Sequence, residues 1–274
     1  MKKIKWKNII IVFIIFIFII LFFISFFNVI KWYSDSKSTK EQIKKIEKIV
    51  DVKEITDENL ENIEIIEQEE ELPEFNPYWD YIKMNLISVD FNELKDINSD
   101  TVGWIKVNGT NINYPFVKSS NNEYYLNHSF DKSYNDSGWL FLDYRNNINE
   151  LNKNTIIYGH GRLEGTMFGT LKNILNSDWI NDTNNYIVKL STEKENTLWQ
   201  VFSVYRIPTT SDYIKVDFSS NEEFVEWANM LIDRSYYIFN TNVSSNDNIL
   251  TLSTCYNEND KIVLHAKLIK KEIR

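Results

Sequence analysis

The chain has 274 residues and is poor in several residue types that would otherwise define a class of protein. Its single cysteine, Cys255, excludes an intramolecular disulfide framework and zinc sites built on paired cysteines. Its 7 Gly and 4 Pro exclude collagen-like and Pro/Gly-rich disordered proteins. A formal net charge of −9 disfavours general nucleic-acid binding. We expect no metal, no cofactor and no nucleic-acid partner.

The first 30 residues combine a basic start with a long uncharged run. Four lysines in residues 1–8 precede any acid, and residues 9–30 carry no charge. As a helix this run spans roughly 33 Å, enough to cross a hydrocarbon core of about 30 Å. A cleaved signal peptide is the alternative, but the run is long for one and no small-residue cleavage site follows it. We expect a single-pass anchor in the cell membrane, with residues 1–8 cytoplasmic and the remainder extracellular.

Residues 31–76 have the composition of an acidic stalk or linker. The spacing of Ser38 and Glu41 predicts a capping box at the start of a helix that contains Ile43, Ile46 and Val50. Positions 54–80 contain eleven acidic residues and no Lys or Arg, which is typical of solvated, poorly folded chain. A calcium site is the alternative, but residues 67–71 lack the spacing of a calcium loop.

Residues 77–274 have the pattern of a mainly β domain. Apolar spacing predicts a helix that includes Tyr78, Trp79, Ile82, Leu86 and Ile87, and a short second helix at residues 91–94. A late peripheral helix is expected after Ser220, which has capping-box spacing to Glu223. Eight β-type runs, which the late helix interrupts, suggest an eight-stranded closed β-barrel. The runs are residues 102–107, 112–117, 138–142, 154–158, 186–190, 198–207, 249–253 and 261–269.

Two residues with nucleophilic or acid–base chemistry follow predicted strands. His160 lies in a Gly-His-Gly sequence directly after residues 154–158, and glycines there would leave room for a substrate. Cys255 ends the run that begins at Ile249. Strand alternation places Cys255 on the face of Thr251 and Ser253, opposite the leucines. A lone cysteine is more often a buried apolar residue, but this one shares a face with hydroxyl groups.

A cysteine and a histidine together support acyl transfer. The thiolate attacks a carbonyl carbon, the imidazolium protonates the departing amine, and a nearby cation stabilises the thiolate or the oxyanion. The order in this chain is His before Cys, whereas papain-like enzymes have Cys first. Caspases share the order, but their Q-A-C-x-G sequence is absent.

At these motifs the sequence resembles the sortases of class B. The residues 251–255, Thr-Leu-Ser-Thr-Cys, match the family's T-L-x-T-C, and residues 154–160, Asn-Thr-Ile-Ile-Tyr-Gly-His, match the segment around its histidine. Further similarity at residues 103–105, 125–128, 141–143 and 167–171 extends the resemblance over roughly residues 77–270. It implies a sortase-type barrel.

The resemblance also implies a membrane-anchored cysteine transpeptidase. Cys255 would cleave a C-terminal sorting signal after Thr, and His160 would protonate the leaving amine. A peptidoglycan precursor amine would then resolve the thioester. The partners implied are secreted proteins that bear an Asn-Pro-x-Thr-like or related signal. The substrate-groove positions of the family carry over to Asn122, Leu126, Tyr158, Thr209, Tyr213, Ile214 and Ser253, although each could also be ordinary barrel packing.

One position departs from the family pattern. Where class B sortases place an arginine on the strand after the cysteine, this chain has Lys261, which keeps the charge but not the forked donor geometry. Lys261 is our candidate for the functional cation, since Arg206 is a poor substitute. His265 and His128 are expected to be structural. A non-catalytic or weakly active sortase-fold binding module, or a peptidase that hydrolyses its thioester with water, are the alternative hypotheses.

Overall fold

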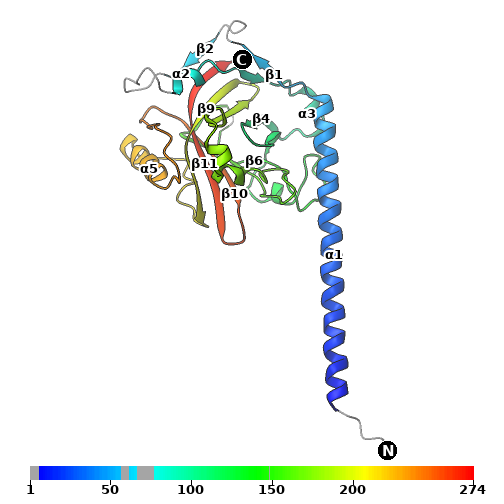
Figure 1. Ribbon diagram of the computed structural model, residues 1–274. Coiled ribbons are helices and arrows are strands. Elements are labelled where there is room, and N and C mark those ends of the chain that lie inside the picture. Colours follow the sequence, from blue (N-terminus) through cyan, green and yellow to red (C-terminus); the bar gives the residue numbers. More distant parts are fainter. Residues whose placement is uncertain (1–5, 57–61, 67–76, 148) are drawn as a thin grey trace, which may run out of the picture.

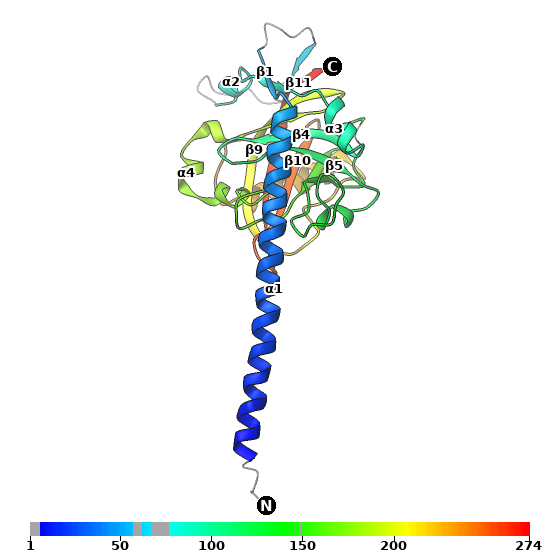
Figure 2. The same cartoon turned by 90° about the vertical axis from the view of Figure 1, so that its right-hand side faces the viewer.

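The computed structural model describes residues 6–56, 62–66, 77–147 and 149–274. A long N-terminal helix, α1 (Trp6–Ile49), lies along the outside of a β-barrel and continues well beyond it, as both views show (Figures 1 and 2). The stretch of α1 from Ile9 onward is long and apolar enough to cross a membrane, with a mean hydropathy of 3.6 in its most apolar window. The apolar side chains of this stretch are exposed, whereas Ile46 near the end of the helix is buried against the barrel.

The barrel confirms the predicted fold. The strands follow the order β10-β7-β6-β5-β4-β8-β9-β11, and β11 pairs back with β10, so these eight strands form a closed cylinder. Each of the eight predicted runs corresponds to one of them. The strands are β4 (Thr101–Val107), β5 (Asn113–Lys118), β6 (Phe141–Leu142), β7 (Asn154–Tyr158), β8 (Ile187–Ser191), β9 (Glu195–Pro208), β10 (Ile249–Cys255) and β11 (Asp260–Ile273).

Two short strands occupy parts of the acidic segment that we expected to be solvated. β1 (Lys53–Ile55) pairs with β3 (Leu86–Ser88), and β2 (Ile63–Ile65) pairs with the end of β11. Glu54 lies 3.3 Å from the Lys106 ammonium and 3.7 Å from that of Lys189. The charge of Lys189 above all lowers the pKa of the Glu54 carboxyl, and burial opposes this only in part. Basic groups on the barrel thus pair with Glu54, which we expected to be solvated. Residues 57–61 and 67–76 of the acidic segment lie outside the described residues.

Two helix predictions near the start of the chain are wrong in their bounds, although Ile43 and Ile46 are helical as expected. No helix begins at Ser38, because α1 runs through this position and the Thr39 hydroxyl donates a hydrogen bond to the Asp35 carbonyl within the same helix, at 2.9 Å. The helix expected from Tyr78 to Ile87 ends early: α2 (Tyr78–Tyr81) is short, and Leu86 belongs to β3. The buried ammonium of Lys270 binds the carbonyls of Ile82 and Met84, at 2.8 Å each.

The later helices agree with the sequence pattern. α3 (Asn92–Ile97) follows Phe91, and α5 (Asn221–Asp233) begins after Ser220, whose hydroxyl accepts a hydrogen bond from the Glu223 amide at 3.2 Å. α5 buries Phe224, Trp227 and Leu231 against the outside of the barrel. The other short helical elements are Tyr124–Leu126, Leu171–Leu175, α4 (Ser177–Ile180) and Thr183–Asn185.

Candidate active site

Cys255 and His160 lie at the same edge of the barrel because β10 and β7 run parallel. Ser253 pairs with Tyr158 in the register of these strands, so each candidate residue lies two positions beyond a paired residue. The glycine after the histidine is required for this approach: a Cβ atom on Gly161 would lie 2.3 Å from the Cys255 carbonyl oxygen. The predicted alternation of β10 also holds, since Leu250 and Leu252 enter the barrel core and the Cys255 side chain is exposed.

Lys261 is the direct neighbour of Cys255 across the hairpin of β10 and β11. The two residues are paired in the register, and the Lys261 Nζ donates a hydrogen bond to Cys255 Sγ at 2.9 Å. An ammonium group at this distance is placed to stabilise negative charge that develops at the reacting centre. The structure therefore brings a cation to the sulfur from the strand position that the sequence analysis singled out.

His160 is held by a hydrogen bond from its own ring to the main chain. Its Nε2 lies 2.7 Å from the Leu126 carbonyl oxygen. Because a carbonyl only accepts, Nε2 carries a hydrogen and Nδ1 is the nitrogen that can exchange a proton. Burial lowers the pKa of His160, the charges of Arg162 and Lys261 lower it further, and the bond to Leu126 opposes them. The imidazole is thus predominantly neutral at neutral pH.

All ten predicted site residues line one cavity of about 580 Å³. Cys255, His160 and Lys261 lie together in it, with the residues of both predicted groove walls. Its lining consists of Asn122, Leu126, Phe141, Tyr158, Gly159, His160, Thr209, Thr210, Ser211, Tyr213, Ile214, Ser253, Thr254, Cys255 and Lys261. Five lining residues were not predicted: Gly159 and Thr254, which directly precede His160 and Cys255, and Phe141, Thr210 and Ser211. Phe141 belongs to a motif that carried the resemblance, whereas Thr210 and Ser211 only adjoin a predicted wall residue.

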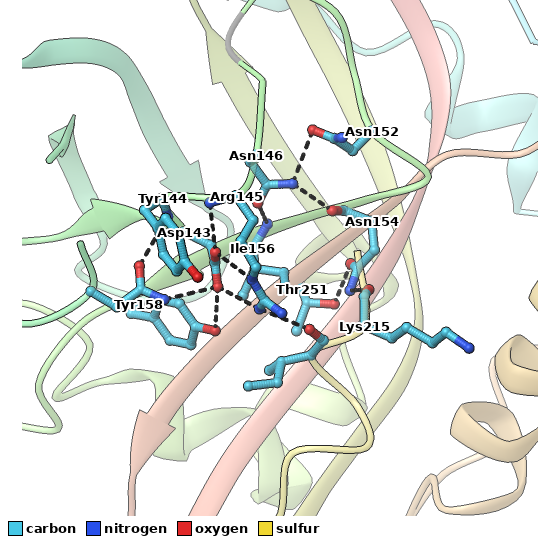
Figure 3. Close-up of polar contacts among 12 residues, drawn as sticks. Asp143, Tyr144, Arg145, Asn146, Asn152, Asn154, Ile156, Tyr158, Lys215 and Thr251 are labelled. Atoms are coloured by element: carbon cyan, nitrogen blue, oxygen red, sulfur yellow. Dashed lines mark hydrogen bonds and ion pairs between the residues drawn. The ribbon is translucent and has the colours of Figure 1, made fainter. Parts of the chain in front are cut away.

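A buried carboxylate beneath the cavity was also missed as a site residue (Figure 3). Asp143 is fully buried and binds Arg145 through both oxygens, at 2.9 and 2.7 Å. It also accepts hydrogen bonds from the Tyr158 hydroxyl at 2.9 Å and the Asn122 amide at 3.0 Å. Arg145 donates in turn to the Ile214 carbonyl at 3.0 Å.

This cluster joins three residues that line different parts of the cavity. Burial disfavours charged Asp143, but its hydrogen bonds, those from Arg145 above all, outweigh this and lower the pKa of the carboxyl. Asp143 therefore stays ionised. Its charge holds Asn122 and Tyr158 in place, and its partner Arg145 holds the backbone of Ile214.

The remaining histidines lie outside the cavity lining. His265 is fully buried between the Tyr205 hydroxyl, at 2.8 Å, and the Thr251 hydroxyl, at 2.9 Å. Burial lowers its pKa to about 3. His128 stacks on Tyr124 and bonds to the carbonyl of that residue. Within the described part of the chain, no three His, Cys, Asp or Glu side chains gather as metal ligands would.

Arg206 turns away from the cysteine. Its guanidinium binds Asp260 and lies 3.9 Å from the centre of the Tyr256 ring. Lys261 is the cation that lines the cavity beside the sulfur.

A closed eight-stranded barrel with a cysteine, a histidine and a cation at one edge defines a protein built for cysteine-dependent acyl transfer. The family model described as "Sortase domain" matches residues 105–269. Sortase B of Staphylococcus aureus is 37% identical over 184 residues, which cover 66% of this chain and 75% of that protein.

Solved structures agree with these matches. The S. aureus sortase B–substrate complex has a TM-score of 0.62 at 36% identity and covers 66% of this chain and 84% of its own. A structure of sortase B complexed with triglycine has a TM-score of 0.62 at 35% identity and covers 66% and 85%. The chain belongs to the sortase family, in class B, and is a cysteine transpeptidase.

Proposed function

We propose that the chain is a membrane-anchored transpeptidase that cleaves a C-terminal sorting signal after Thr and transfers the upstream protein to a cell-wall amine. The observation that carries this proposal is the Lys261 ammonium 2.9 Å from the Cys255 sulfur, in the same cavity as His160. α1 supplies the anchor, since its apolar part is exposed and long enough to span a bilayer.

The reaction proceeds in two acyl transfers. The Cys255 thiol passes its proton to His160 Nδ1 as Sγ attacks the Thr carbonyl carbon. The peptide C–N bond then breaks, and the departing amine takes that proton from Nδ1. The incoming amine then attacks the thioester carbon and returns a proton to His160, and the C–S bond breaks as the new amide forms. The Lys261 ammonium stabilises negative charge that develops on the sulfur and lies close enough to stabilise the carbonyl oxygen as charge develops on it.

The nature of the two substrates is supported by the relatives. One solved sortase B holds a substrate and another holds triglycine, a short peptide with a free amine. In this chain an elongated peptide would lie between Asn122 and Leu126 on one side and Thr209 and Ile214 on the other. Asn-Pro-x-Thr is the signal class that we expect.

Intact mass spectrometry of the full chain in detergent tests the proposal. Asn-Pro-x-Thr and Leu-Pro-x-Thr peptides are added, each with and without triglycine. We expect a thioester adduct with the Asn-Pro-x-Thr peptide that is lost in Cys255→Ala, and a triglycine-linked product when the amine is present. A folded chain that forms no adduct would favour the binding-module alternative, and a product distribution unchanged by triglycine would indicate a hydrolase.

A further inference from the structure

Two loops at the catalytic edge contact α1 immediately after its apolar run. Lys31 is the first charged residue beyond that run, and its Nζ lies 2.6 Å from Asp136 and 5.1 Å from the centre of the Tyr134 ring. One turn later, the Asp35 carbonyl accepts a hydrogen bond from the Asn135 amide at 3.2 Å. These contacts hold the loop of residues 134–136 against the first turns of α1 outside the apolar run.

The loop that follows His160 makes the second set of contacts. The Arg162 guanidinium lies 5.9 Å from the centre of the Trp32 ring. The next residue, Leu163, is 83% exposed. A single exposed leucine needs no explanation on a protein surface. The position of Leu163 is informative, however, because the residue lies in the loop that follows His160, beside the start of the exposed part of α1.

The height of these loops above a bilayer follows from helix geometry. α1 is continuous from Trp6 to Ile49, so each residue adds about 1.5 Å along its axis. Each headgroup layer adds roughly 5–7 Å to the hydrocarbon core, a depth that corresponds to about one helical turn. Residues 31–35 therefore lie at the level of the headgroups, and the loops bound to them lie there too.

We propose that the catalytic edge of the barrel rests on the membrane surface, with Tyr134 and Leu163 in the headgroup layer. Trp32 and Tyr33 are exposed at the same level, and amphipathic aromatic rings favour this interface. Figure 1 supports this arrangement. The β10–β11 hairpin turns at the lower edge of the barrel, and the free part of α1 extends beyond that same edge. The substrate cavity then opens close to the lipid surface. The inference rests on the membrane anchor of the proposed function, but not on its chemistry.

A site-specific probe tests this placement in the full chain. Cys255→Ser removes the native thiol, and Leu163→Cys then carries one environment-sensitive fluorophore. The labelled chain is reconstituted in phosphatidylcholine nanodiscs with or without headgroup-nitroxide lipid. Ile273→Cys is the matched control, because Ile273 is 49% exposed at the far end of β11, twelve residues beyond Lys261 and about 40 Å along the strand.

We expect a blue-shifted emission at position 163 that loses most of its intensity with nitroxide lipid, and no change at position 273. Equal emission at both positions in an inserted chain, quenched or unquenched, overturns the proposal while leaving the anchor intact. Alkaline extraction reports insertion separately. A chain that is released by alkali refutes the anchor and this inference together.

Discussion

At the residue scale, Lys261 lies beside Cys255 at the position where the resemblance to class B sortases led us to expect an arginine. The Lys261 Nζ lies 2.9 Å from Cys255 Sγ. Lysine therefore places a positive charge beside the sulfur, although it lacks the forked hydrogen-bond donor of arginine. We expect Lys261→Met to lower kcat/KM by about 10²–10³-fold, as removal of a donor to a developing oxyanion does. Lys261→Arg should retain activity. Peptide-transfer kinetics measure both variants.

Two further observations separate a catalytic from a structural effect of Lys261. Lys95→Met removes a lysine that pairs with Glu193 on the surface, and it should leave kcat/KM unchanged. The rate of Cys255 alkylation at fixed pH should fall in Lys261→Met but not in Lys95→Met, because only the Lys261 ammonium hydrogen-bonds to the sulfur. Unchanged alkylation and transfer in Lys261→Met would remove this lysine from the mechanism.

Asp143 is a positioning residue in our interpretation, because it touches Asn122 and Tyr158 rather than the sulfur. Asp143→Asn weakens the Arg145 pair and, through it, the contact to the Ile214 backbone. We expect KM for the signal peptide to rise several-fold with a smaller change in kcat. The matched control is Glu193→Gln, which breaks a surface ion pair whose residues do not line the cavity.

Loss of stability would also reduce activity, so the Asp143→Asn variant needs a second measurement. Breaking a buried ion pair costs about 3–5 kcal/mol in general, and the partly exposed Arg145 side chain reduces that cost here. Urea unfolding reports this loss. A fall in kcat with KM unchanged, in a variant that remains folded, would contradict the positioning role.

At the element scale, the sequence pattern was most informative where strands alternate. The barrel strands carry apolar, β-branched and aromatic residues with turn residues between them, and the local pattern agrees with the tertiary fold. The same local signals were misleading near the start of the chain. The spacing at Ser38 matches a cap by chance, and the apolar spacing of residues 78–87 covers a turn and a strand whose partner is β1.

The candidate site shows the same contrast between residues that a local pattern predicts and residues that depend on tertiary contacts. Strand-end positions and the family resemblance identified ten residues that line the cavity. The Asp143 cluster depends on contacts among segments that lie far apart in the sequence, such as Asn122 and the backbone of Ile214. No local pattern encodes such a junction, so it became visible only in three dimensions.

His265 links β11 to two neighbouring strands and makes stability depend on pH. It is hydrogen-bonded to Tyr205 on β9 and Thr251 on β10, and it is packed near Trp227 of α5. Its folded pKa of about 3 lies below the usual value of 6.5, owing to burial and, secondarily, the charge of Arg234. Between these values the unfolded chain binds the proton and the folded chain does not.

The stability that His265 contributes should therefore be full above pH 6.5 and fall by about 1.4 kcal/mol per pH unit below it, and His160, whose pKa burial also lowers, adds to this slope. Urea unfolding of the full chain between pH 7 and 5 measures this slope. His265→Gln should flatten the slope even if the variant is less stable throughout, whereas His128→Gln should retain it. An unchanged slope in His265→Gln would assign the acid sensitivity to other groups.

At the scale of the whole molecule, the last turns of α1 are part of the folded unit. Ile46 is 3% exposed and belongs to the same hydrophobic cluster as the barrel strands, and Ile43 and Val50 pack beside it. β1 and β2 add main-chain pairing to this contact. The end of α1, the short strands β1 and β2 and the barrel thus pack together, and the division into stalk and domain at residue 77 remains a prediction.

Truncation of one buried side chain tests this coupling. Ile46→Ala removes apolar contacts between α1 and the barrel, and we expect a loss of about 2–4 kcal/mol in the free energy of unfolding, within the range for buried isoleucine. Lys45→Ala, on the adjacent position of the same helix, is the control and should change stability by less than about 0.5 kcal/mol. Urea unfolding in detergent measures both variants. Tryptophan fluorescence, to which the buried barrel residue Trp104 contributes, reports the transition. If the two variants unfold alike, the contact of Ile46 adds little to the stability of the barrel. If Ile46→Ala alone is destabilised, the cooperative unit includes the last turns of α1, and the apolar part of that helix is joined to the barrel through a continuous folded segment.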